Sequence, residues 1–172
     1  MRIAFLTSYP LDVRIGSGVI RTIQCFSNSL RIAGHSTDII HPKSFTSSNY
    51  LNLANQRLQF NRQIVAKEFS KYDLVIGSDF DGYALKLPPE TRYFALNAGI
   101  LADIVRFEEG RVQKTLQHLA CREKQNVQKA EKVIVPSHYT AQQVKRFYEV
   151  DSGNIAVVPL GIDFEYWQKL YL

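Results

Sequence analysis

Two short apolar runs near the end of the chain constrain its fold most strongly. The runs are Val133–Val135 and Ile155–Val158, and a proline follows each of them directly. Short runs that stay apolar without polar alternation are typical of strands buried on both faces of a parallel sheet. Between the runs, Ser137 is placed to cap a helix that begins near Tyr139, because a serine oxygen can accept a hydrogen bond from the first helical turn. This part of the chain is therefore predicted to form a strand, a helix and a second strand.

The same alternation of strands and helices is expected along the rest of the chain. The other predicted strands are Arg2–Thr7, Ser36–Ile40, Tyr72–Gly77 and Arg92–Leu96. The other predicted helices run from Val19 to Ala33, from Leu58 to Phe69 and from Arg111 to Ala130. Apolar strands that alternate with helices predict an α/β fold with a doubly wound, mostly parallel sheet, Rossmann-like, with helices on both faces. In such sheets ligands bind beyond the carboxyl ends of the strands.

Length and cysteine content indicate a single intracellular domain. A chain of 172 residues fits one domain with a core of its own. Cys25 and Cys121 lie within helical apolar patterns and lack metal-ligand spacing, so both are interpreted as buried thiols in a reducing cytoplasm. The first apolar run is too short for a secretory signal, and no run is long enough to span a membrane.

The charge of the chain argues against nucleic acid as a partner. The formal net charge is +5, but the basic residues are scattered and lack interleaved aromatic residues. Basic faces with aliphatic stems are better suited to an anionic membrane surface. We therefore expect peripheral contact with the inner face of the membrane.

Gly16, Ser17 and Gly18 open the first long helix and form a candidate anion site. Glycines at a helix start let backbone N–H groups approach a phosphate closely. The pattern does not match a dinucleotide fingerprint, since Arg21 stands where the third glycine belongs, and no phosphate-loop lysine follows. The alternative is a flexible loop with a glycine cap.

Polar residues after two central strands form a second candidate site. Asp79 and Asp81 follow one strand, and Gly82 permits the turn that would bring both carboxylates to a ligand. We interpret them as hydrogen-bond acceptors for hydroxyls of a sugar or another acceptor; a divalent cation site, or a turn in which Asp79 caps a following helix, are the alternatives. Asn97 follows the next strand and can orient a hydroxyl, although an amide cannot shuttle a proton. Its alternative role is turn formation.

Three features together resemble the N-terminal domain of the GT4 family of retaining glycosyltransferases. These are the glycine loop at Gly16–Gly18, the helix start at Ser137, and the end Pro159-Leu160-Gly161-Ile162-Asp163. The resemblance implies one half of a GT-B fold, in which two Rossmann-like domains face each other across a cleft. It places Ser137 near the ligand and makes Gly161 the pivot between the domains. It identifies no catalytic residue.

The resemblance also implies a function. Residues 1–163 would be the acceptor-side domain, 164–172 the start of the interdomain linker, and the C-terminal donor-binding domain would be absent from this chain. The complete enzyme would move a sugar from a nucleotide-sugar to a sugar or lipid-linked acceptor with retention of configuration, without metal or cofactor. This chain alone would then be inactive. The alternative is a standalone Rossmann-like subunit that needs a separate donor-binding chain.

Overall fold

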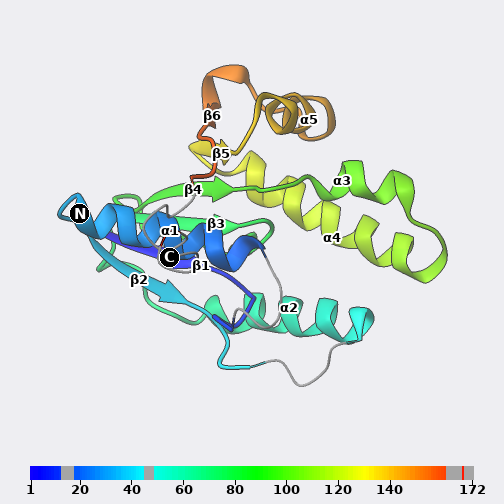
Figure 1. Cartoon of the computed structure of the whole chain (residues 1–172). Coiled ribbons are helices and arrows are strands. Elements are labelled where there is room, and N and C mark those ends of the chain that lie inside the picture. Colours follow the sequence, from blue (N-terminus) through cyan, green and yellow to red (C-terminus); the bar gives the residue numbers. More distant parts are fainter. Residues whose placement is uncertain (13–17, 45–48, 162–167, 169–172) are drawn as a thin grey trace.

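The computed structural model, which describes residues 1–12, 18–44, 49–161 and 168, contains one six-stranded sheet. The strands lie in the order β2-β1-β3-β4-β5-β6, and each neighbouring pair is parallel (Figure 1). The strands are β1 (Arg2–Leu6), β2 (Ser36–Ile40), β3 (Leu74–Ser78), β4 (Arg92–Leu96), β5 (Lys132–Val135) and β6 (Ile155–Val157). The α-helices are α1 (Gly18–Ile32), α2 (Tyr50–Ile64), α3 (Leu101–Ile104), α4 (Gly110–Gln128) and α5 (His138–Tyr148). The predicted α/β fold class is confirmed.

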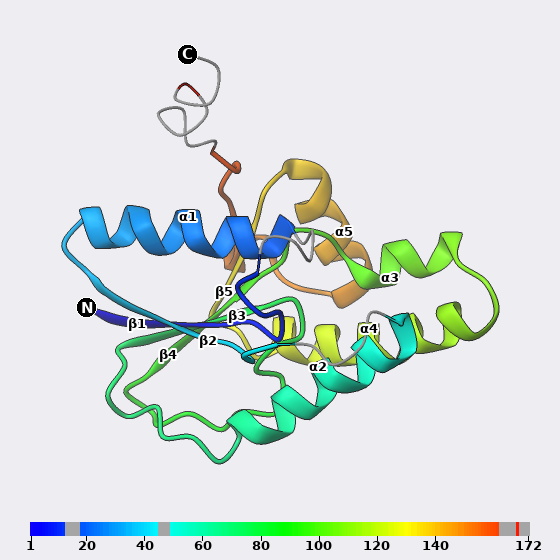
Figure 2. The same cartoon turned by 60° about the horizontal axis from the view of Figure 1, so that its bottom comes forward.

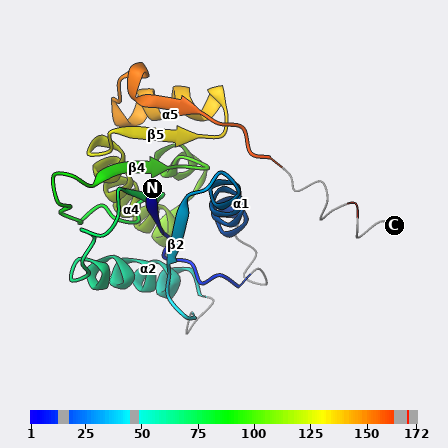
Figure 3. The ribbon, with the colours of Figure 1, turned by 90° about the vertical axis from the view of Figure 1, so that its left-hand side faces the viewer.

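Helices cover both faces of the sheet, as the apolar strands predict. Figures 2 and 3 show α1 on one face and α2, α4 and α5 on the other. Successive side chains of a strand point to opposite faces, so β1 serves two cores. Phe5 packs in the cluster that includes Ile23 of α1, whereas Leu6 packs in the cluster that includes Phe60 of α2. The central strands β1 and β3 are thus buried from both sides.

Helix ends explain where the predicted boundaries hold and where they are wrong. Gly34 follows α1 with φ +85°, and Ser137 caps α5, as predicted, by accepting a hydrogen bond from the N–H of Thr140 at 3.1 Å. The helix expected from Leu58 to Phe69 is instead α2, which starts eight residues earlier at Tyr50 and ends at Ile64. Its cap is Asn49, whose Oδ1 accepts from the N–H of Leu51 at 3.0 Å. The short α3 and the 3-10 turn Val105–Phe107 were not predicted.

The interpretation of the two cysteines as buried thiols is wrong. Cys25 and Cys121 are both free and exposed. Each lies on a helix beside its buried stripe, since Ile23 and Ser27 of α1 and Ala120 and Glu123 of α4 point inward. A turn of about 100° per residue carries the intervening position toward solvent. The thiols therefore contribute nothing to the core.

Gly77 in β3 allows the segment after the strand to fold back closely over the sheet. A Cβ at this position would lie 2.0 Å from the carbonyl oxygen of Asp81 and 2.1 Å from Oη of Tyr93. Real Cβ atoms do not approach other atoms so closely, and both neighbours are buried. The turn that carries the acidic residues after β3 therefore requires glycine at this position.

Replacing Gly77 by alanine is expected to destabilise the protein by about 3 kcal/mol or more, because buried backbone must move to admit the methyl group. Chemical denaturation followed by circular dichroism measures the change. Gly153→Ala is the matched control, since nothing lies within 4 Å of a Cβ at that exposed position. Equal stability of the two variants would show that the turn does not pack against β3 as described.

Candidate functional site

The polar residues of the chain that are most deeply buried gather at the carboxyl ends of β1 and β3. These strands are neighbours, with Leu6 beside Gly77, yet the chain leaves β1 toward β2 on one side and leaves β3 toward β4 on the other. A crevice forms where neighbouring strands send their connections in opposite directions, and ligands of doubly wound sheets bind there. Ser8 and Tyr9 follow β1, and Asp79 follows β3 directly. This edge is the candidate site.

Arg57 of α2 is the centre of the cluster. Its side chain is buried, and its Nε donates a hydrogen bond to Oγ of Ser8 at 2.7 Å. Its Nη2 donates to Oδ2 of Asp79 at 3.1 Å and lies 3.9 Å from Oδ2 of Asp81. A buried charge is tolerated only when it is paired and hydrogen-bonded, and Arg57 meets both conditions. One side chain thereby joins α2 to the ends of β1 and β3.

Two aromatic rings hold the same guanidinium. Its carbon lies 4.4 Å from the ring centroid of Tyr9 and 4.2 Å from that of Phe80. Attraction between a cation and an aromatic face grows when water is excluded, as it is here. The Tyr9 ring is therefore fixed in place at the edge, with its side chain only half-buried.

Asp81 is an internal anchor of the cluster. Its Oδ2 accepts hydrogen bonds from the N–H of Ser8 at 2.6 Å and from Oγ of Ser8 at 2.8 Å. Its Oδ1 accepts from Nδ2 of Asn61 at 2.7 Å, and the side chain is wholly buried. Burial raises the pKa of Asp81 to about 6, against the opposing effects of Arg57 and these hydrogen bonds. Its hydrogen bonds are thus all made within the chain.

Asp79 differs from Asp81 because part of its carboxylate remains available. The residue has φ 53°, a left-handed backbone conformation that non-glycine residues adopt mainly where the surroundings impose it. Its N–H donates to the carbonyl of Leu96, and its carbonyl accepts from Nδ2 of Asn126. The side chain is 15% exposed, and Oδ1 accepts no hydrogen bond from the described part of the chain. Burial raises the pKa of Asp79, and Arg57 opposes the shift.

A second buried carboxylate, Glu123 of α4, organises the next loop along the edge. Its Oε1 accepts from Nδ2 of Asn97 at 3.0 Å, and its Oε2 accepts from the N–H of Leu101 at 2.7 Å and from the hydroxyl of Tyr148. Burial and then the charge of Asp79 raise the pKa of Glu123 to about 8, although these donors act in the opposite direction. Oδ1 of Asn97 is buried and has no partner within the described ranges.

The structure brings some of the residues predicted for the site together and leaves others apart. Asp79 and Asp81 share Arg57, and Asn97 lies one strand further on, linked to them through Glu123. Ser137 is used as a helix cap, Gly161 is exposed beyond β6, and Gly18 is the first residue of α1. Gly16 and Ser17 lie outside the described residues. Whether any of these residues contacts a ligand stays a prediction.

Two of the alternatives for the acidic pair find no support in the geometry. No helix begins after Asp79 in the segment 79–91, so the residue caps none. The carboxylates of Asp79 and Asp81 face a guanidinium rather than each other across an open space. Across the described ranges, no group of three or more His, Cys, Asp or Glu side chains is placed to hold a metal ion.

Sequence reasoning missed the residues that hold the site together. Arg57 and Asn61 stand four residues apart on α2, so they share the helix face that packs on the sheet. Glu123 lies on the apolar stripe of α4 beside Ala120 and Val127. A charged or amide side chain on an otherwise apolar stripe was the signal in both helices, because such a residue must find a buried partner.

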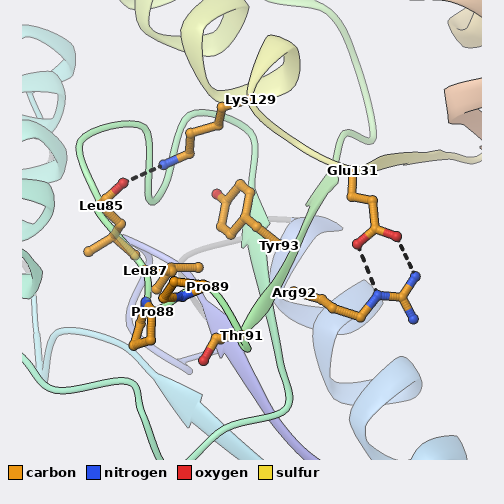
Figure 4. Close-up of a pocket in the computed structure, with 9 residues that line it drawn as sticks. All are labelled: Leu85, Leu87, Pro88, Pro89, Thr91, Arg92, Tyr93, Lys129 and Glu131. Atoms are coloured by element: carbon orange, nitrogen blue, oxygen red, sulfur yellow. Dashed lines mark hydrogen bonds and ion pairs between the residues drawn. The ribbon is translucent and has the colours of Figure 1, made fainter.

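A second concavity lies at the other end of the sheet. The pocket in Figure 4 has a volume of about 340 Å³ and is lined by Leu85, Leu87, Pro88, Pro89, Thr91, Arg92, Tyr93, Lys129 and Glu131. Nζ of Lys129 donates to the carbonyls of Gly82 and Leu85, and partial burial lowers the pKa of Lys129 to about 8. These bonds fasten the end of α4 to the connection between β3 and β4. None of the predicted site residues lines this pocket.

The parallel sheet and the polar cluster at its switch point define a Rossmann-like α/β protein whose candidate site lies at the carboxyl edge. Its sequence matches the model of Glycosyltransferase Family 4 over residues 16–166, which is most of the chain, and the chain belongs to that family. The predicted family is thus confirmed, and the chain is a glycosyltransferase domain. No curated protein matches the sequence. Among the helices of the described ranges, none combines the length and apolar character needed to cross a bilayer.

Replacing Arg57 by methionine is expected to lower the free energy of unfolding by about 3 to 5 kcal/mol, because Asp79 and Asp81 lose their buried countercharge. Urea denaturation at neutral pH measures the effect. Arg62→Met, on the exposed side of the same helix, should change stability by no more than about 0.5 kcal/mol. Similar losses in both variants would contradict the central role of Arg57.

Glu123→Gln is expected to flatten the pH dependence of stability. The pKa of Glu123 is about 8 in the folded protein against an ordinary value of 4.5, so the folded state binds more protons between these pH values. Its free energy of unfolding therefore falls as pH rises from 4.5 to 8, and the variant should lack up to about 5 kcal/mol of that fall. Denaturation curves across this range test the difference. Glu90→Gln, at an exposed position, is the control, and parallel profiles for wild type and Glu123→Gln would disprove the shift.

Proposed function

We propose that this domain is the acceptor-side half of a glycosyltransferase that moves a sugar from a nucleotide-sugar to an acceptor with retention of configuration. The donor is held mainly by a second domain across a cleft, and residues 164–172 begin the link to it. The reaction needs neither metal nor cofactor. The observation that carries the proposal is Oδ1 of Asp79, which accepts no hydrogen bond from the described part of the chain and lies at the switch point of a glycosyltransferase domain.

The cluster at the carboxyl edge suits the binding of an acceptor. Arg57 fixes Asp79 on one side, and the left-handed backbone of Asp79 fixes it on the other. Its unpaired Oδ1 can therefore accept a hydrogen bond from a sugar hydroxyl without losing side-chain freedom on binding. Groups held in place before the ligand arrives bind more strongly than mobile ones. The proposed role of Asp79 is to orient the acceptor.

A second domain is needed because sugar transfer depends on positioning two substrates. Holding reactants at near-attack geometry contributes about 7 to 11 kcal/mol to catalysis. The edge of this sheet supplies one wall of such a site. We therefore expect the chain to fold on its own, since its sheet is covered by its own helices, and to have no transferase activity alone.

Contact with a membrane is consistent with the surface near the same edge. Ile104, Phe107 and Tyr139 are exposed, with Phe107 at 78% and Tyr139 at 62%. The hydroxyl of Tyr139 donates to Asp103 at 2.6 Å, so the start of α5 lies beside α3. Exposed aromatic side chains of this kind favour the interface of a bilayer. This surface supports a lipid-linked acceptor and an inner-membrane location.

The test compares the chain alone with the chain joined to its proposed donor-binding domain. Each protein is incubated with UDP-sugars and GDP-sugars and with a panel of neutral glycosides, and acceptor-dependent release of nucleoside diphosphate is measured. We expect release only when both domains are present. The anomeric configuration of the product, read by NMR, should equal that of the donor sugar.

Turnover by the chain of 172 residues alone would contradict the need for a second, donor-binding domain. An inverted product would contradict retention. Activity that appears only when a separately encoded donor-binding chain is added would replace the two-domain enzyme by a two-subunit one.

A further inference from the structure

The candidate site holds more negative than positive charge. Asp79 and Asp81 are buried together, and Nη2 of Arg57 lies 3.1 Å from Oδ2 of Asp79 and 3.9 Å from Oδ2 of Asp81. One guanidinium thus faces two carboxylates. An anion placed beside Oδ1 of Asp79 would meet repulsion from that carboxylate.

Two side-chain oxygens at the edge accept no hydrogen bond from the described residues. Oδ1 of Asp79 accepts no bond from the described residues, and Oδ1 of Asn97 is buried without a partner. Both atoms are acceptors, and they follow neighbouring strands whose ends pair Ser78 with Leu96. The Asp79 side chain is partly exposed, so a hydroxyl group of a ligand can donate to its Oδ1. A phosphate dianion has no proton to donate.

The residues around the candidate site are aromatic and acidic. Tyr50, the first residue of α2, is 38% exposed and lies near enough to Arg57, Tyr9 and Glu108 for each to act on its pKa. Glu108 adds another carboxylate to this rim. The rings of Tyr9 and Tyr50 offer apolar faces, against which the C–H face of a sugar ring can be buried.

We infer that the acceptor presents neutral hydroxyl groups to this edge and that the charge of Asp79 selects against phosphorylated acceptors. The inference rests on the proposed function and names its acceptor class: an unphosphorylated sugar or sugar moiety. It concerns the acceptor alone. The phosphates of the donor, which the glycines at 16 and 18 are proposed to approach, lie outside it.

The test measures binding to the isolated, isotope-labelled chain by NMR. The probes are the methyl α-glycosides of glucose, galactose and mannose, each compared with its 6-phosphate. We expect neutral glycosides to shift the amide signals of Tyr9, Tyr50 and Asp79, and the phosphates to bind about tenfold more weakly at low salt. The ratio should shrink as salt is added, because screening weakens repulsion.

Asp79→Asn separates charge from shape. The amide removes the charge and keeps the size of the side chain, so the preference for the neutral glycoside should fall to about one. Asp151→Asn, at an exposed position after α5, should leave the preference unchanged. If Asp79→Asn fails to fold, the salt dependence of the wild-type ratio decides the matter.

Tighter binding of the phosphorylated sugars at low salt would overturn the inference, as would the absence of shifts at Asp79 with every neutral glycoside. The binding test does not require turnover. A selective chain whose two-domain form transfers no sugar would therefore refute the proposed function while the selectivity stands.

Discussion

The guanidinium of Arg57 is the interaction on which the carboxyl edge depends. It reaches Ser8 after β1 and Asp79 after β3 from a helix that crosses both strands, and Tyr9 and Phe80 enclose it. A charge in this position is costly unless every partner is in place. The buried cation therefore also specifies where these partners lie, because each of them must reach it.

The carboxyl groups around Arg57 contribute both to the packing of the domain and to the chemistry of the candidate site. Burial outweighs the effect of Arg57, so the carboxyl groups around it hold their protons more tightly than they would in water, and Glu123 does so near neutral pH. Glu123 in turn joins α4 to α5 through Tyr148 and to the loop after β4 through Asn97. The acidic groups that stabilise the edge are thus the same groups on which the proposed ligand selectivity depends.

The sheet could be predicted from sequence, but the centre of the site could not. The ends of β2 and β4 match the prediction, and the fully buried β3 lies within two residues of its predicted bounds. The start of α2 was missed because Asn49 lies in Asn-rich and Ser-rich text that is typical of loops. Arg57 was missed with it, because it lies on that helix, seven residues after Tyr50. Its partners follow other strands, and only the three-dimensional fold brings them together.

The positions of Asp79 and Asp81 could be predicted from sequence, but their separate roles could not. Asp79 and Asp81 were correctly placed after a strand, and the turn at Gly82, with φ +103°, was expected. Their different roles depend on a left-handed residue and on Asn61 from a distant helix, neither of which has a local sequence signal.

Measuring the titration of the side-chain carboxyl carbons by NMR in the folded chain tests the account of a buried carboxyl cluster at this edge most directly. The account predicts that Glu123 titrates near pH 8 and Asp81 near pH 6. Titration of both groups near pH 4, as for carboxylates in water, would contradict it.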